Sequence, residues 1–122
     1  MLRILLTSAK ASVLFVVLLL AVPAFAHSHP VSMLPAADST VSAPAKVDIH
    51  FSEGLEPKFS SITVTNAGGH VINKETSKLA DGDNKFLSVP LPELGPGVYT
   101  VNWVAVAVDG HRSSGEYKFT VK

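Results

Sequence analysis

Apolar and polar residues alternate along several short segments of this chain, and this alternation constrains the fold more than any other feature. In residues 46–52, the side chains of Val47, Ile49 and Phe51 all point to one side of an extended backbone. Residues 115–121 alternate in the same way. Segments of this kind form strands that place one face in a hydrophobic core. No stretch of residues 27–122 shows a helical period of useful length.

Glycines and prolines cut the rest of the chain into pieces of strand length. The sequence has eight of each, and their turns separate further strands expected at 61–65, 70–72, 86–89 and 98–108. Residues 70–72 are expected to return as the hairpin partner of residues 61–65. About seven short strands with regular turns predict an all-β fold, a two-layer antiparallel sandwich of the immunoglobulin-like type.

Two aromatic residues on the segment 98–108 are expected to fill the core. Tyr99 and Trp103 share a face with Val101, Ala105 and Ala107. The chain has no cysteine, so it lacks the cysteine and tryptophan signature of a true immunoglobulin domain, and it has neither a disulfide framework nor a thiolate metal site.

The first 26 residues are read as a targeting segment. Twenty of them are apolar, and the apolar run lies between Lys10 and Pro23. Ala24–Ala26 has the small-x-small pattern that a signal peptidase reads, so we expect cleavage after Ala26. A membrane-spanning helix needs about 20 continuous apolar residues, and the run is shorter, although an uncleaved anchor remains the alternative. We therefore predict a signal peptide at residues 1–26 and one exported β domain at residues 27–122.

The charge of the mature domain excludes some partners. Ten basic and ten acidic side chains balance in the whole chain, and two of the basic ones, Arg3 and Lys10, belong to the signal segment. The mature domain is therefore slightly acidic, so we expect no binding to nucleic acid and no membrane insertion after cleavage. Short strands and a nearly neutral surface offer no clear oligomer interface, and we expect a monomer.

A histidine at the start of the mature chain is a special metal ligand. Cleavage after Ala26 gives His27 a free α-amine, and this amine can chelate one metal ion together with the Nδ1 atom of the same histidine. Asp109 and His111 follow the strand expected at 98–108, and in extended backbone such residues project to the same side. If the sandwich brings the N-terminus beside them, an amine, two imidazoles and a carboxylate converge.

This donor set favours Cu(II), which accepts tetragonal nitrogen and oxygen ligation. Zinc accepts the same donors tetrahedrally, but the amine and imidazole chelate fixes two cis positions about ninety degrees apart, as tetragonal Cu(II) prefers. Soft Cu(I) prefers sulfur ligands, and residues 27–122 contain only one, Met33. We therefore predict a Cu(II) site and no dedicated Cu(I) site.

His29 opens an alternative that needs no fold. A free amine, two backbone amides and an imidazole at the third position form a square-planar Cu(II) chelate, and His27-Ser28-His29 satisfies that rule. The two modes use the same amine and exclude each other, and the sequence alone leaves both open.

Other residues are weaker candidates. Glu53 follows a predicted strand and is a candidate axial ligand, or an orienting group behind a ligand imidazole. His50 lies on the polar face of its strand and His70 just beyond a Gly-Gly turn, so both are expected at the surface. An isolated terminal histidine or an Asp-Gly turn is usually only solvated surface, and it is their combination that predicts a metal site.

The order of these motifs resembles the CopC family of periplasmic copper-resistance proteins over essentially all of residues 27–122. The resemblance rests on six motifs in this order along the chain. They are the processed N-terminal histidine, the sequence around Leu34-Pro35-Ala36, His50-Phe51-Ser52-Glu53, Gly97-x-Tyr99-x-Val101-x-Trp103, Asp109-Gly110-His111 and residues 115–121.

The resemblance implies a Greek-key barrel or sandwich, a periplasmic setting, and Cu(II) ligation by His27, Asp109 and His111, with Glu53 close by in some members. It also implies a role in copper resistance or supply, with a membrane protein of the CopD type as recipient. Some members carry a methionine-rich loop that binds Cu(I). Residues 54–91 contain no methionine, which places the chain with members that bind Cu(II) only.

Three functions compete at this point. The first is a copper carrier or buffer that is not an enzyme. The second is a copper-dependent oxidative enzyme, because a terminal-histidine chelate is also the centre of polysaccharide-cleaving enzymes. Against it, no aromatic platform for a glycan is evident, since core positions are expected for Trp103, Tyr99 and Tyr117. The third is an exported immunoglobulin-like interaction module whose histidines are incidental, in which case Cu(II) leaves its melting temperature unchanged.

Overall fold

The computed structural model describes residues 27–122, and these residues form eight strands. The strands are β1 Pro30–Leu34, β2 Thr40–Val41, β3 Lys46–Phe51, β4 Ser61–Thr65, β5 Lys78–Ala80, β6 Asp83–Pro90, β7 Gly97–Val106 and β8 Arg112–Val121. Within the described part of the chain, no helix is long and apolar enough to cross a membrane. The predicted signal peptide and its cleavage site lie outside the described residues.

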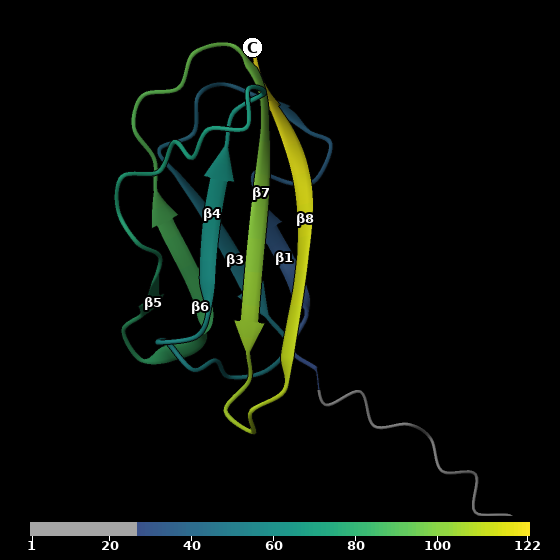
Figure 1. Cartoon of the computed structure of the whole chain (residues 1–122), viewed down its shortest axis with the longest axis vertical. Helices are drawn as coiled ribbons and strands as arrows, with labels where there is room; N and C mark the ends of the chain where they lie inside the picture. The colour runs from purple at the N-terminus through teal and green to yellow at the C-terminus, as the bar shows by residue number, and fades with distance from the viewer. Residues whose placement is uncertain (1–26) are drawn as a thin grey trace, which may run out of the picture.

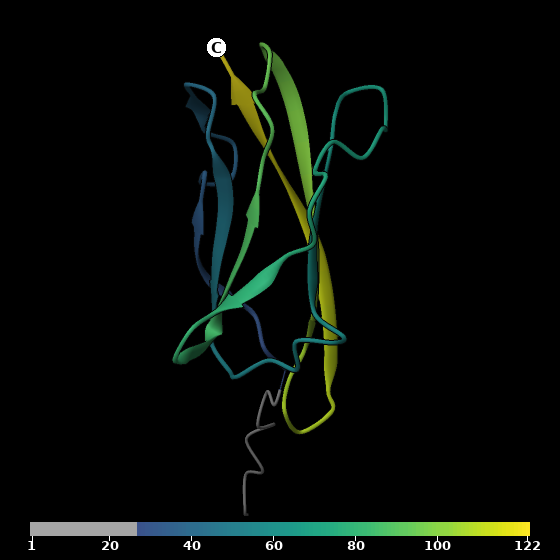
Figure 2. The same cartoon turned by 90° about the vertical axis from the view of Figure 1, so that its left-hand side faces the viewer.

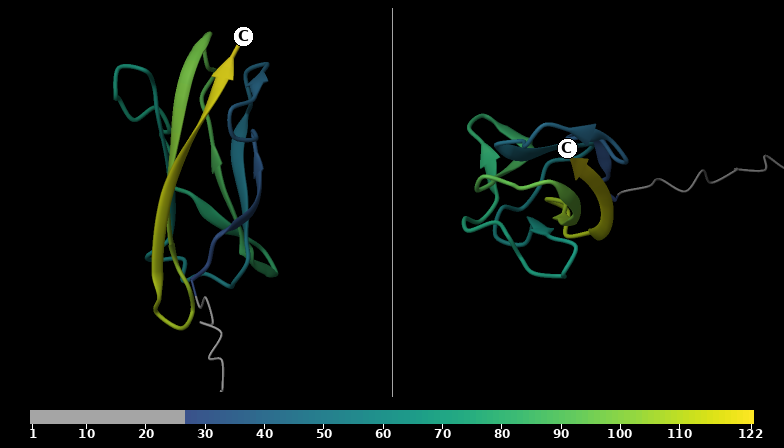
Figure 3. Two further views of the ribbon diagram at one scale, coloured as in Figure 1. Left: turned by 90° about the vertical axis from the view of Figure 1, so that its right-hand side faces the viewer. Right: turned by 90° about the horizontal axis from the view of Figure 1, so that it is seen from above.

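The strands form two four-stranded sheets in the orders β1-β3-β6-β5 and β2-β8-β7-β4. Seen edge-on, β1 and β3 lie in one layer and β4, β7 and β8 in the other (Figure 2). The pairs are antiparallel except for β2, which runs parallel to the end of β8. Viewed from above, the two layers wrap around one interior (Figure 3). The all-β sandwich predicted from the alternation is confirmed.

The core consists of the inward faces of both sheets. Val47, Ile49 and Phe51 of β3 are almost fully buried. They pack with buried residues of the other strands, including Leu87, Val89, Ile62, Val64, Val101 and Phe119. The inward residues thus follow the pattern that predicted these strands, although Asp48 on the other face of β3 is also buried and accepts a hydrogen bond from Ser88.

The predicted strands are confirmed at β3, β4, β6, β7 and β8, with ends that move by a few residues. The hairpin expected at residues 70–72 is confirmed in part. Val71 pairs antiparallel with Thr65, and the Ile72 amide donates to the Val64 carbonyl at 2.9 Å. The pairing stops there and forms no strand, because the side chain of Asn73 accepts the hydrogen bond of the Val64 amide. Strands β1, β2 and β5 were not predicted.

The two aromatic residues expected in the core differ in burial. Tyr99 is buried and stacks on Phe119 with ring centroids 5.6 Å apart. Trp103 is half-buried and meets Phe51 edge-to-face at 5.5 Å. Both rings therefore pack on the core, Trp103 at its margin.

One end of the sandwich gathers the segments that carry the predicted ligands. The hairpin between β7 and β8 lies at this end, as do the residues before β1, while the C-terminus lies at the other (Figure 1). The loop after β3 joins them, because the Val108 amide donates to the Gly54 carbonyl and Leu55 bridges to Ala107. Three segments that are far apart in sequence thus meet at one end of the fold.

Candidate metal centre

Ser28 fixes the start of the described chain to the body of the sandwich. Its side chain is fully buried. The Ser28 hydroxyl donates to the Glu53 carbonyl at 3.2 Å and accepts from the Glu53 amide at 3.3 Å. Its carbonyl accepts a hydrogen bond from the Ser113 hydroxyl at the start of β8. The residue beside His27 is therefore held between the loop after β3 and the β7–β8 hairpin.

The hairpin itself is a tight turn that exposes Asp109 and His111. The Gly110 amide donates to the Ala107 carbonyl at 2.8 Å and the Ala107 amide to the His111 carbonyl at 2.9 Å. Gly110 has a φ of 90°, a conformation that glycine adopts without strain. Asp109 accepts a hydrogen bond from the His111 amide at 3.1 Å, and its other oxygen lies 3.1 Å from the His111 Nδ1 atom.

These anchors bring the first predicted ligand beside the hairpin. The rings of His27 and His111 meet edge-to-face with centroids 5.3 Å apart. His27, Asp109 and His111 are all exposed. The structure therefore brings His27 beside His111, which also contacts Asp109, from a position more than eighty residues away in the sequence.

The electrostatics of the hairpin favour a carboxylate that is charged. Hydrogen bonds from the backbone amide and then the imidazole of His111 hold the pKa of the Asp109 carboxyl below its usual value. Asp109 is therefore an anion at neutral pH, as a metal ligand must be.

Side chains alone do not complete a metal centre here. Among the described residues, no three His, Asp or Glu side chains are grouped so as to hold a metal ion. The fourth predicted donor, the α-amine of His27, exists only after cleavage, because in the full chain this nitrogen belongs to a peptide bond. The donors present are two imidazoles and a carboxylate at the surface, and this set fits Cu(II) or zinc chemistry.

His29 faces a different neighbour from His27. Its amide donates to the Ser52 hydroxyl at 3.1 Å, and its Nδ1 atom lies 3.1 Å from the same oxygen. The Ser52 amide in turn donates to the His29 carbonyl at 2.8 Å. The structure therefore places His29 against Ser52 rather than with the pair at the hairpin.

The remaining candidates lie apart or act through their backbone. Glu53 is exposed, and its recorded contacts are those of its backbone with Ser28. His70 is exposed, and His50 has an exposed side chain 3.7 Å from a carboxylate oxygen of Asp83. The surface placement predicted for these two histidines is confirmed.

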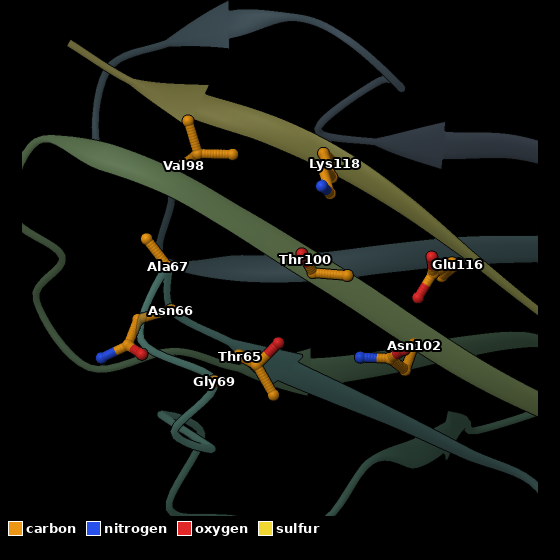
Figure 4. Close-up of a pocket in the computed structure, with 9 residues that line it drawn as sticks. All are labelled: Thr65, Asn66, Ala67, Gly69, Val98, Thr100, Asn102, Glu116 and Lys118. Carbon is orange, nitrogen blue, oxygen red and sulfur yellow. The ribbon is translucent and has the colours of Figure 1, made fainter.

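A groove on the described part of the molecule lies away from these residues. It has a volume of about 520 Å³ and crosses the outer face of β4, β7 and β8, where Thr65, Asn102, Glu116 and Lys118 line it (Figure 4). None of the predicted ligands contributes to it. The candidate site is therefore a corner of exposed donors and not a cavity.

Sequence reasoning missed the serines that anchor the N-terminus. Ser28, Ser52 and Ser113 carry no motif, and a serine beside a histidine at a processed terminus gives no sign that it is buried. No pattern in the sequence points to them, because their role depends on contacts between residues 23 to 85 positions apart.

Comparison with known proteins identifies the relatives of this chain. The CopC domain family matches residues 30–122. Protein YobA of Escherichia coli K12 is 42% identical over 100 residues, which cover 80% of this chain and 81% of that protein. Copper resistance protein C of Escherichia coli is 39% identical over 106 residues, which cover 81% of this chain and 84% of that protein.

A solved structure agrees with the fold. The crystal structure of CopC from Methylosinus trichosporium OB3b superposes with a TM-score of 0.74 at 35% sequence identity, and the match covers 79% of this chain and 94% of that one. The resemblance drawn from the order of motifs is thereby confirmed.

Proposed function

This chain belongs to the CopC family, and from that premise we propose that it is a periplasmic Cu(II) carrier or buffer in copper resistance or homeostasis. The mature protein begins at His27 and binds one Cu(II) ion through the amine and imidazole of His27 together with Asp109 and His111. It is a binding protein and not an enzyme, and copper is its cargo. Cleavage after Ala26 adds the N-terminal amine of His27 to the imidazole and carboxylate donors at this end of the fold.

The observation that carries this proposal is the approach of His27 to His111, with ring centroids 5.3 Å apart and Asp109 hydrogen-bonded to the second ring. The hydrogen bond from Ser113 to Ser28 holds the chain terminus at the hairpin, and His27, Asp109 and His111 are all exposed there. Cu(II) competes with protons for these donors, because imidazole and carboxylate groups bind a metal in their deprotonated forms. Binding is therefore tight at neutral pH and weakens in acid, as the donors take up protons.

The oxidation state follows from the donors. Nitrogen and oxygen ligands suit Cu(II), whereas Cu(I) prefers sulfur. Met33, the one methionine of residues 27–122, is half-buried on β1 and packs against the core. Its sulfur is thus committed to the interior, which supports a Cu(II) protein without a dedicated Cu(I) site.

Further parts of the proposal concern the setting of the protein. We propose that a cleaved signal peptide exports it to the periplasm, that it acts as a monomer, and that it exchanges copper with an inner-membrane transporter of the CopD type. The names of its relatives support a copper-related role: copper resistance protein C is one of them.

The carrier role is favoured over oxidative catalysis by the placement of the aromatic residues. Tyr99 and Tyr117 are buried, and Trp103 packs on Phe51. These rings support the core and leave no tyrosine or tryptophan platform on which a glycan would stack.

The experiment compares two pairs of substitutions in mature protein that begins at His27. The test variant is Asp109→Ala with His111→Ala. The control is His50→Ala with Asp83→Ala, which removes an exposed histidine and carboxylate pair of the same composition. Cu(II) affinity is measured against a competing chelator, and the coordination by EPR.

The proposal expects the control to match the parent, and the test variant to bind more weakly with a changed EPR spectrum. A test variant with the affinity and spectrum of the parent would show that Cu(II) binds elsewhere, and the local His27–His29 chelate is then the site.

A further inference from the structure

The segment between the two N-terminal histidines is held by more contacts than a flexible terminus needs. Ser28 is 0% exposed, and its hydroxyl exchanges two hydrogen bonds with the backbone of Glu53. The hydroxyl of Ser113 closes the other side by donating to the Ser28 carbonyl. We call this arrangement of Ser28, Glu53 and Ser113 the serine seat.

The next residue continues the same attachment. The His29 amide donates to Ser52 Oγ at 3.1 Å, and the His29 carbonyl accepts from the Ser52 amide at 2.8 Å. Residues 28 and 29 are therefore fixed on both sides before β1 begins at Pro30.

These contacts bear on how an ion can be held. The local chelate requires the amide nitrogens of Ser28 and His29 to turn inward, lose their protons and bind the metal, with His27 and His29 wrapped around the same ion. In the structure the His29 amide is directed at Ser52 instead, and the Ser28 side chain is buried under the hairpin. The local chelate can form only if Ser28 leaves its seat and the hydrogen bonds to Ser52 break.

We propose that Ser28 is a positioning residue that selects the coordination mode, because its seat holds His27 against the β7–β8 hairpin and denies Cu(II) the local His27-Ser28-His29 chelate. This inference rests on the proposed function. It assigns Ser28 no contact with the metal. It requires a small side chain at position 28, because a fully buried serine leaves no room for a larger one.

The test variant is Ser28→Leu, which adds bulk without adding a metal donor. Its matched control is Ser32→Leu, at an exposed position on β1 close to the same terminus. Ser28→Ala removes the hydroxyl alone and serves if the leucine variant fails to fold. All are prepared as mature protein beginning at His27.

The first readout needs no metal. Amide hydrogen exchange at His29 should be about tenfold faster in Ser28→Leu than in the parent, which corresponds to the loss of its hydrogen bond to Ser52. Ser32→Leu should match the parent.

The second readout is the Cu(II) EPR and visible absorption spectrum. In the parent and in Ser32→Leu the spectrum should change on His111→Ala and not on His29→Ala. In Ser28→Leu the spectrum should instead change on His29→Ala and not on His111→Ala, because a terminus released from the serine seat is free to wrap around the ion.

Two results overturn the inference, and they differ from each other. If Ser28→Leu keeps the exchange rates of the parent and a spectrum that depends on His111, the serine seat selects nothing, while the proposed site stands. If the parent spectrum already depends on His29, the proposed site and the inference both fail.

Discussion

Gly115 is the residue at which a single methyl group should disturb the packing behind the candidate site. It lies on β8 directly opposite Trp103 on β7. A Cβ atom at position 115 would lie 2.6 Å from Cζ2 of the indole and 2.9 Å from Cε2. Gly115→Ala therefore forces the indole to move.

The size of the effect follows from two opposing terms. Carbon atoms pack best at about 3.5–4.0 Å, so the overlap is close to an ångström, and overpacking of this kind costs about 1–3 kcal/mol. Replacing a strand glycine with alanine otherwise stabilises by about 0.5–1 kcal/mol. The clash dominates, because Phe51 lies against the indole with ring centroids 5.5 Å apart and is itself buried. The net loss is about 0.5–2 kcal/mol.

The assay is urea unfolding followed by the fluorescence of Trp103, the single tryptophan of the chain. Gly95→Ala is the control, since a Cβ atom there meets nothing within 4 Å. Gly115→Ala should have a lower midpoint and a shifted emission maximum, and Gly95→Ala should match or slightly exceed the parent. A Gly115→Ala variant as stable as Gly95→Ala would show that the indole moves at no cost, and the packing argument would be refuted.

Two further predictions concern stability. The Tyr117 hydroxyl is buried without a hydrogen-bond partner among the described residues, so Tyr117→Phe should stabilise by about 1 kcal/mol at pH 7. Burial and then the charge of Asp48 raise the pKa of Tyr117. The parent therefore loses stability as the pH rises above about 10, the pKa of tyrosine in the unfolded chain, and the variant does not. Unfolding curves in which the stability difference between variant and parent narrows above pH 10 would contradict this. Cu(II) should raise the melting temperature of the mature protein, because a ligand that binds only the folded state stabilises it by about 2.7 kcal/mol at 100 times its Kd. Differential scanning fluorimetry that shows no shift would favour the plain interaction module.

Much of the fold was predictable, because long strands with one buried face carry a period of two. The inward residues of β3, β7 and β8 show it clearly. Strands β2 and β5 have two and three residues, too few to show a period. β1 begins with a proline and alternates weakly in burial. The hairpin expected at residues 70–72 pairs only at Val71, because the side chain of Asn73 replaced the next backbone partner of β4.

In the candidate site, the metal donors were predictable from the sequence, and the residue that positions them was not. His27, Asp109 and His111 were predictable as donors, since their chemistry is a property of the residues themselves. Whether the fold brings these residues together was not predictable from the sequence; the structure places the ring of His27 beside that of His111, and His111 beside Asp109. The role of Ser28 was not predictable, because a buried serine is defined by its partners Glu53 and Ser113 and not by its neighbours in the sequence.

The central claim is that the first residue of the mature protein supplies an amine and an imidazole to Cu(II). The most direct measurement is Cu(II) affinity, by competition with a chelator, of protein that begins at His27 and of protein that retains Ala26. The account predicts one tightly bound Cu(II) ion per chain in the first and a large loss of affinity in the second, because the added residue turns the His27 amine into a peptide nitrogen. Equal affinities would contradict it.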